Sequence, residues 1–224
     1  MTTQKTTAGR LARLSLVLAI VLLGCVPYTR ADQPGVQQHD PTLPRAVFGG
    51  DSITVSVKVD VQQELSDETS WWSHFLAGSG WLMSDFRQAD DDVLSHPAFA
   101  PDAVVINIGT NDVDVCAQSV GCGTEWQALE LDDVWAPYVG AAVPCRIAVT
   151  AVYEPDGITG LNDRIAHLES TGVITHVADW KAHSAGHPEW FVDAEGHPTT
   201  AGRGAYADFI VDELESVCPA GPPP

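Results

Sequence analysis

Three polar residues stand at points of the chain where their side chains could do chemistry. Ser52 follows the short apolar run 46–48 through two glycines and an aspartate, and Asn111 follows the longer apolar run 103–108. Both runs are typical of buried strands, and glycine suits a sharp turn from strand to helix. His197 lies near the end of the chain, just before a helical pattern. A serine at such a turn either caps the helix or acts as a nucleophile, and its own stretch leaves both roles open.

The positions of these residues predict that they share one edge of a parallel sheet. Ser52 and Asn111 each come directly after a strand, and His197 comes between the last strand and the last helix. In open α/β sheets the ligand lies beyond the carboxyl ends of the strands. That edge would then carry a nucleophile, a base and an amide donor, which is the set that acyl transfer needs.

The sequence around each of these residues resembles a block of the SGNH or GDSL hydrolase family. The matches are Gly50-Asp51-Ser52, Gly109-Thr110-Asn111-Asp112, and His197 followed by Pro-Thr-x-x-Gly, and the resemblance extends from about Ala46 to Glu215. Three matches in this order make a fairly specific signal. The resemblance implies an SGNH-type serine esterase or acylhydrolase that needs no cofactor.

The resemblance also assigns roles. Ser52 would attack an ester carbonyl, and His197 would take the serine proton and return it to the leaving alcohol. The Asn111 side chain and the Ser52 backbone N–H would form the oxyanion hole. Asp112 is expected to be structural and to close its own turn by an Asx hydrogen bond. The substrate would be a small acyl group on a lipid, a glycan or a small ester, with either hydrolysis or acyl transfer as the outcome.

The acid that orients the histidine is displaced from the family position. The family has an aspartate three residues before the histidine, where this chain has Ala194; Asp193 lies four residues before His197 and Glu195 two before. A catalytic histidine needs an acceptor at its other ring nitrogen. We favour Asp193, because a bulge absorbs one residue and Gly196 lets the loop fold back. Glu195 and a backbone carbonyl are the alternatives.

The second block of the family offers a glycine between the second strand and the next helix, and we find none at the expected place. The segment expected there is 87–89, where Arg87 could donate its backbone N–H instead, and Gly78 and Gly80 lie earlier. The missing glycine and the displaced acid motivate a rival interpretation. In that interpretation the chain is a degenerate domain of this family that binds a glycan or a partner without turnover.

The pattern of the remaining residues predicts the fold. Valine at alternate positions within 53–65 is typical of a strand, whereas the resemblance implies the first helix there, so the two expectations conflict. Aromatic residues at helical spacing predict a helix over 69–77, and 81–86 reads as the second strand, followed by a helix that opens at 90–92. Later strands and helices alternate. We therefore predict an α/β protein with a flavodoxin-like three-layer α/β/α sandwich and a parallel sheet of about five strands.

The N-terminus reads as a targeting segment. Basic residues precede the apolar run Leu14–Leu23, which is too short for a comfortable transmembrane helix. We expect a signal peptide over 1–24, a flexible tether over 25–44, an SGNH hydrolase-like domain over 45–218 and a disordered tail over 219–224. The sequence before Cys25 resembles a bacterial lipoprotein signal that leads to lipidation of that cysteine. Cleavage after Ala31 is the alternative, and both place the mature domain outside the cytoplasm, lipid-anchored or secreted.

The other four cysteines are expected to form two disulfides in an exported chain. Cys116 and Cys122 share one loop at the edge that carries Ser52. Cys145 precedes the fourth strand at the opposite edge, and the last helix runs antiparallel to the strands and brings Cys218 to that edge too. The expected pairs are Cys116–Cys122 and Cys145–Cys218.

The charge of the chain limits its partners. It has 30 acidic against 11 basic residues, for a formal net charge of −19. Such a chain repels nucleic acid and anionic membrane surfaces, so we expect no nucleic-acid partner. We also expect a monomer. A metal cluster of His183, His187, Asp193 and His197 is a weaker alternative, because Gly186 and Pro188 interrupt any helical ligand spacing. We expect no metal.

Overall fold

The computed structural model describes residues 43–68, 71–94, 100–117, 124–153 and 160–218. The described strands are β1 (Arg45–Gly50), β2 (Trp72–Ala77), β3 (Ala103–Asn107), β4 (Cys145–Val149) and β5 (His176–Ala178). The described helices are α2 (Ser52–Glu68), α3 (Met83–Leu94), α4 (Thr110–Ala117), α5 (Thr124–Gly140), α6 (Leu161–Ser170), α7 (Trp180–His183), the 3-10 turn η2 (Pro188–Trp190) and α8 (Thr200–Val217). The predicted signal peptide, Cys25 and the tail 219–224 lie outside the described residues.

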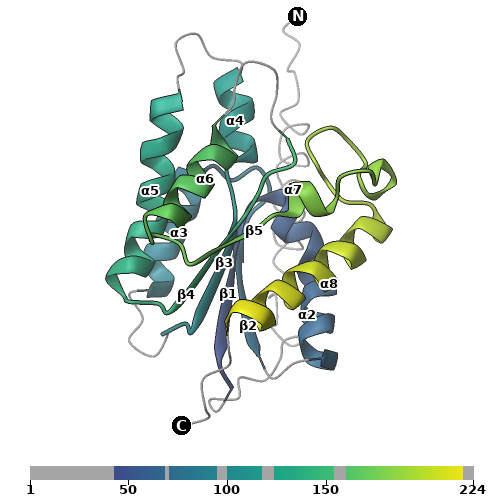
Figure 1. Cartoon of the computed structure of the whole chain (residues 1–224), viewed down its shortest axis with the longest axis horizontal. Coiled ribbons are helices and arrows are strands. Elements are labelled where there is room, and N and C mark those ends of the chain that lie inside the picture. Colours follow the sequence, from purple (N-terminus) through teal and green to yellow (C-terminus); the bar gives the residue numbers. More distant parts are fainter. Residues whose placement is uncertain (1–42, 69–70, 95–99, 118–123, 154–159, 219–224) are drawn as a thin grey trace, which may run out of the picture. The chain divides into compact units, whose positions relative to one another are not determined.

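The five described strands form one parallel sheet in the order β2-β1-β3-β4-β5 (Figure 1). This is the order of the flavodoxin-like doubly wound sheet. The chain moves outward from β1 in both directions, so the carboxyl ends of β1 and β3 are neighbours at the point where the direction reverses. The predicted fold class is confirmed.

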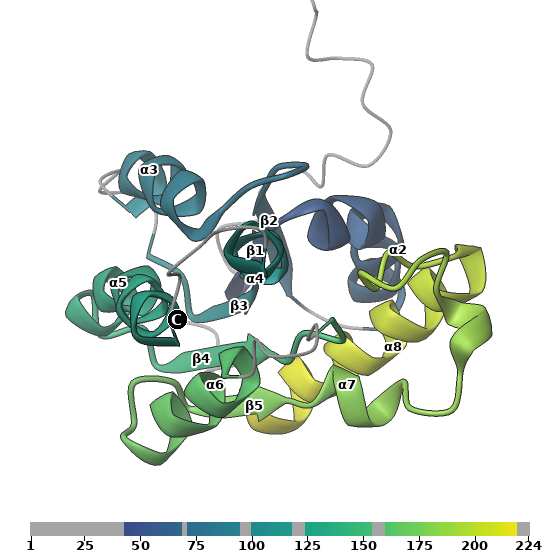
Figure 2. The same cartoon turned by 90° about the horizontal axis from the view of Figure 1, so that it is seen from above.

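Helices cover both faces of the sheet and enclose two apolar cores (Figure 2). On one face α2 packs against α8, and residues such as Val57, Leu65 and Ile210 are buried there. On the other face α3, α5 and α6 lie side by side and bury residues such as Phe86 of α3 and Trp135 of α5. A sheet covered on both faces buries its strands from both sides. The burial holds the strand ends at fixed positions, and the site depends on those positions.

The strand pattern within 53–65 is wrong, and the helix that the resemblance implied is present as α2. Ile53, Val57, Val61 and Leu65 recur every four residues and are all buried. Two of the valines that suggested a strand, Val55 and Val59, face solvent, and Val59 is 71% exposed. Valine therefore occupies both the buried and the exposed side of this helix, and its spacing alone did not identify the buried face.

The helix predicted over 69–77 and the strand predicted over 81–86 are exchanged in the structure. The first segment contains β2, whose Phe75 stacks on Phe48 of β1 with ring centroids 4.9 Å apart. A strand covered on both faces carries apolar residues at consecutive positions, which mimicked helical spacing. The second segment lies in and before α3, where Met83 and Phe86 are buried three residues apart. The helix thus begins before residues 90–92 and not at them.

One of the two expected cystines lies within the described residues. Cys145 and Cys218 are joined by a disulfide with their Cα atoms 5.7 Å apart, at the edge away from Ser52. Cys116 is also disulfide-bonded, but Cys122 lies outside the described residues, so their pairing stays a prediction. Within the described residues, no helix has both the length and the apolar character that crossing a bilayer requires.

Candidate active site

Ser52 is the first residue of α2 and lies at the carboxyl end of β1. The turn before it is tight, because a Cβ atom on Gly50 would lie 2.2 Å from the backbone oxygen of Asn107. Asp51 takes the capping role that Ser52 could have had: its Oδ1 accepts a hydrogen bond from the Ile53 N–H at 3.0 Å. The serine hydroxyl is therefore available for another partner, and its Oγ lies 2.8 Å from His197 Nε2.

A short hairpin between η2 and α8 holds His197 in place. Its two arms are tied by the bridge between Phe191 and Pro198 and by two backbone hydrogen bonds of 2.8 Å, from the Val192 N–H to the His197 oxygen and from the Thr199 N–H to the Trp190 oxygen. Thr199 then caps α8 by accepting a bond from the N–H of Gly202. The histidine is thus fixed by main-chain bonds on both sides, just before a long helix whose inner face is buried.

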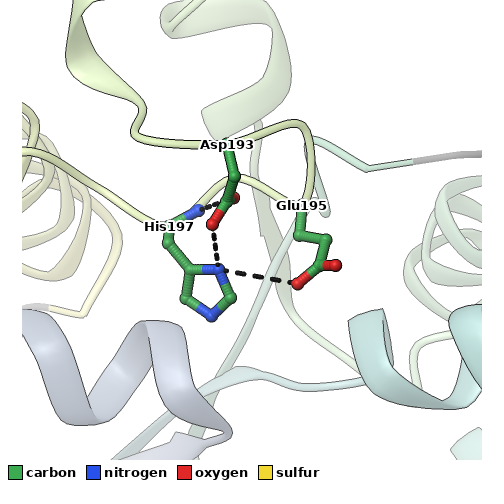
Figure 3. Close-up of side chains that lie close together, drawn as sticks. All are labelled: Asp193, Glu195 and His197. Atoms are coloured by element: carbon green, nitrogen blue, oxygen red, sulfur yellow. Dashed lines mark hydrogen bonds and ion pairs between the residues drawn. The ribbon is translucent and has the colours of Figure 1, made fainter.

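Asp193 is the acid that accepts the hydrogen bond of the histidine ring (Figure 3). Its Oδ2 lies 2.8 Å from His197 Nδ1, and its Oδ1 accepts the backbone N–H of His197 at 3.1 Å. Gly196 has φ +92°, a left-handed conformation that turns the chain back onto Asp193. Glu195 Oε2 is farther from the same nitrogen, at 3.7 Å. One carboxylate thereby holds both the ring and the main chain of the histidine.

The charge on Asp193 is stabilised by these contacts. Burial acts to raise the pKa of Asp193, but the hydrogen bonds from the His197 backbone and ring and the charge of that ring outweigh it. The pKa of Asp193 is therefore below its ordinary value. A carboxylate that stays ionised is what a histidine that must carry a proton transiently requires.

Asn111 lies at the start of α4, beside the turn that follows β2. Its side-chain Nδ2 donates a hydrogen bond of 3.0 Å to the backbone oxygen of Trp81. An amide NH₂ has two donors, so this bond orients the group and leaves its second N–H. Ser52 and Asn111 follow neighbouring strands, as predicted.

The turn after β2 corrects the expectation that the second-block glycine is missing. β2 ends at Ala77 and α3 begins at Met83, so the glycine-containing segment 78–80 lies between the second strand and the next helix. The segment 87–89, where we looked for it, is inside α3. The error came from the exchanged helix and strand. An apolar run that ends in glycine, as in β1 and β3, was the signal that could have found it.

Two buried carboxyl groups lie behind these residues. Asp112 is structural, as expected, but in a different way. Instead of the Asx hydrogen bond expected within its own turn, its two carboxylate oxygens accept the backbone N–H of Met83 at 3.1 and 3.2 Å and cap α3. Burial raises the pKa of Asp112 to about 6, although its hydrogen bonds oppose the rise. Burial likewise raises the pKa of Asp51 to about 6, against the hydrogen bond from Ile53. Neither environment could be predicted from the sequence, because both depend on contacts between elements.

The remaining histidines of this region do not join the site. His187 Nδ1 contacts Glu189 Oε1 at 2.9 Å, and the His187 ring stacks on Trp190 with centroids 4.0 Å apart. His183 stacks on Trp180. The metal cluster that would have combined them with Asp193 is therefore not assembled within the described residues, and the acids that do lie beside His197 are its own hairpin neighbours.

The overall arrangement matches solved structures. A lipase/acylhydrolase from Enterococcus faecalis superimposes with a TM-score of 0.61 at 18% identity, over 78% of this chain and 96% of that one. A GDSL-like lipase from Bacteroides thetaiotaomicron gives a TM-score of 0.61 at 18% identity, over 81% and 92% of the two chains. The C-terminal catalytic domain of peptidoglycan O-acetyltransferase A from Streptococcus pneumoniae gives 0.56 at 18% identity, over 80% and 97%.

The chain has the SGNH/GDSL hydrolase fold. No family profile matches the sequence. No curated protein matches it either. On this fold the serine, asparagine and histidine blocks recognised in the sequence lie at one edge of the sheet, with the Gly78–Gly80 turn between the serine and asparagine blocks along the chain.

Proposed function

We propose that this protein is an exported serine acylhydrolase that cleaves ester bonds through Ser52, His197 and Asp193. One observation carries the proposal: Ser52 Oγ lies 2.8 Å from His197 Nε2, and His197 Nδ1 lies 2.8 Å from Asp193 Oδ2. A nucleophile, a base and a group that orients the base, linked in series by hydrogen bonds, are the parts that covalent acyl transfer needs.

The first half of the reaction forms an acyl-enzyme. Ser52 Oγ attacks the ester carbonyl carbon while His197 Nε2 accepts the hydroxyl proton. The resulting imidazolium keeps its Nδ1–H bond to Asp193, whose negative charge stabilises it. The tetrahedral intermediate then collapses, the ester C–O bond breaks, and Nε2 returns the proton to the departing alcohol oxygen. The acyl group remains on Ser52.

The oxyanion of the tetrahedral intermediate would be held by two donors. The N–H of Ser52 is at the first position of α2, where the helix itself offers no acceptor. The second N–H of the Asn111 side chain is the other donor, aimed by the bond from that amide to Trp81. Removal of one oxyanion donor typically raises the barrier by about 3 kcal/mol. A third, backbone donor would come from residues 79–80 of the turn after β2, because the Gly78 N–H already donates to the Gly50 oxygen at 3.3 Å.

The second half of the reaction repeats these steps with an acceptor. Water, deprotonated by His197 Nε2, gives hydrolysis and releases a carboxylic acid; an alcohol in the same position gives acyl transfer. Small acyl groups on a lipid, a glycan or a small ester fit this chemistry. An O-acetyltransferase domain shares this fold, which supports keeping transfer beside hydrolysis.

The rival interpretation is a degenerate domain that binds without turnover. It was based on a missing second-block glycine and a displaced acid, and the contacts in this structure argue against both reasons. A glycine-containing turn lies between β2 and α3, and Asp193 reaches the histidine from the displaced position. The two functions are separated by release of p-nitrophenol from its acetate and butyrate esters. We expect turnover by the wild-type protein and loss of it in Ser52→Ala. A folded wild-type protein inactive on a broad ester panel would favour the binder.

We also propose that the mature protein is exported and carries lipid on Cys25. The Cys145–Cys218 disulfide supports an oxidising compartment, and the cysteine at the end of the apolar segment supports the anchor. In the native host, Cys25→Ser should move the protein from the membrane fraction to the soluble fraction. A soluble wild-type protein that begins at Asp32 would contradict the anchor but leave export standing.

A further inference from the structure

The hairpin that carries His197 brings three potential metal ligands together. Asp193, Glu195 and His197 each offer one ligand atom, and these atoms all lie within 4.8 Å of one another (Figure 3). It is the only such group among the described residues. Asp193 and Glu195 are exposed and His197 is partly exposed, so an ion could reach them from solvent with a water as a fourth ligand.

The spacing of these atoms fits a tetrahedral transition metal. Zinc binds imidazole nitrogen and carboxylate oxygen at about 2.0–2.2 Å, which puts neighbouring ligands of a tetrahedron roughly 3.4 Å apart. His197 Nδ1 lies 2.8 Å from Asp193 Oδ2 and 3.7 Å from Glu195 Oε2. These two distances bracket the required spacing, and all three ligand atoms lie within 4.8 Å of one another, so side-chain rotations would bring them to it. A nitrogen ligand favours zinc over calcium or magnesium, which prefer oxygen.

We propose that zinc binds Asp193, Glu195 and His197 Nδ1 and thereby switches off the active site reversibly. The inhibitory part of this inference rests on the proposed serine hydrolase function. In the active tautomer, Nδ1 carries the proton donated to Asp193, and the lone pair of Nε2 accepts the Ser52 proton. The same ring nitrogen cannot both donate to Asp193 and bind a metal, so the two states exclude each other.

The proton balance explains the loss of activity. Zinc takes the lone pair of Nδ1, and the single proton of the neutral ring then resides on Nε2. No proton is lost overall; it moves from one ring nitrogen to the other by exchange with solvent. Nε2–H now faces Ser52 Oγ as a donor, so the serine hydroxyl has no base. The metal also occupies the Asp193 oxygen that would have stabilised the imidazolium.

Direct binding is measured first, in the Ser52→Ala protein, so that the result does not depend on turnover. Zinc is titrated calorimetrically, and cobalt(II) serves as a spectroscopic probe because its visible absorption reports a tetrahedral site. We expect one ion per chain, and Glu195→Gln in this background should weaken zinc binding by at least about tenfold. Glu189→Gln is the matched control. Glu189 contacts His187 at 2.9 Å in the same segment but belongs to no three-ligand group of the described residues.

Inhibition is measured second, with p-nitrophenyl acetate. Zinc should inhibit the wild-type protein, EDTA should restore the rate, and calcium at the same concentration should have no effect. The rates of each variant are expressed relative to its own rate without zinc, and the half-inhibitory zinc concentration is read from these curves. Glu195→Gln should raise the half-inhibitory zinc concentration by about tenfold or more, and Glu189→Gln should leave it unchanged. Equal zinc affinity in Glu195→Gln and its parent would overturn the site. An active esterase that binds zinc at this site without inhibition would overturn the switch. Zinc binding by a protein without any esterase activity would support the metal site but refute the proposed function.

Discussion

Asp112→Asn should stabilise the protein increasingly as the pH rises. Asp112 is 1% exposed and caps α3 by accepting the Met83 N–H. Asparagine has nearly the same shape, and its side-chain oxygen can accept the same hydrogen bond. The substitution therefore removes the capacity for charge while it keeps the cap, so the comparison isolates the cost of an ionised carboxyl group at this position.

The magnitude follows from the raised pKa. Burial is the main cause that moves the pKa of Asp112 from 3.8 to about 6. At about 1.36 kcal/mol per pKa unit, this is roughly 3 kcal/mol. The folded pKa lies above the unfolded one, so between about pH 4 and pH 6 the folded state holds more protons than the unfolded state. The wild-type protein consequently loses this stability as the pH rises through that window, and above it the loss is complete.

Urea unfolding followed by tryptophan fluorescence measures the difference between Asp112→Asn and the wild type at intervals from about pH 4 to pH 7. We expect the free-energy difference to grow by up to about 3 kcal/mol in favour of the variant, with equal denaturant slopes. Asp102→Asn is the matched control, since Asp102 also accepts a backbone N–H, from Arg45, but is exposed. A difference that stays constant over the whole range would refute the assignment of a raised pKa to Asp112.

Three further predictions concern the hairpin, the disulfide and the turn after β2. Asp193→Asn should reduce kcat by several orders of magnitude with little change in KM, because the ring of the histidine loses its charged acceptor; an unchanged kcat would point to a serine–histidine dyad. Replacing Cys145 and Cys218 together by serine should lower the free energy of unfolding by about 4 kcal/mol in the chain-entropy model, given their separation of 73 residues, and non-reducing peptide mapping should recover this pair from the wild type. Gly78→Ala should reduce kcat by up to about a hundredfold, because a Cβ there would lie 2.1 Å from the indole ring of Trp81 and would displace the turn. Gly140→Ala should leave kcat unchanged in the same assay, because a Cβ there would meet no atom within 4 Å.

The positions of the site residues could be predicted from the sequence because they depend on local features. Apolar runs that end in glycine mark the carboxyl ends of β1 and β3, and Ser52 and Asn111 follow those ends directly. A parallel sheet then brings the ends together without further information. The wrong assignments between residues 53 and 86 did not affect this argument. Each parallel strand ends at the same edge of the sheet, whatever the length of the helix that connects it to the strand before.

The elements between 53 and 86 could not be assigned from spacing, for a physical reason. A helix in which valine occupies both the buried and the exposed side shows no clear period, as Val57 and Val59 demonstrate. A two-sided strand such as β2 shows consecutive apolar residues, as a buried helix also does. Only the tertiary neighbours distinguish these cases, and the same limit applies to Asp51 and Asp112, whose burial depends on elements far away in the sequence.

The displaced acid indicates what a motif spacing encodes. Asp193 lies one residue farther from the histidine than in the family pattern, yet its carboxylate contacts both the ring and the backbone N–H of His197. The extra residue is accommodated by the left-handed turn at Gly196, where a residue with a side chain would be strained and would approach Val152 at 3.3 Å. The proposed reaction needs an acceptor at Nδ1, and this hairpin supplies one at a spacing of four residues instead of three. The same compact turn holds Glu195 within 3.7 Å of Nδ1, so the geometry that replaces the family spacing also creates the potential metal site.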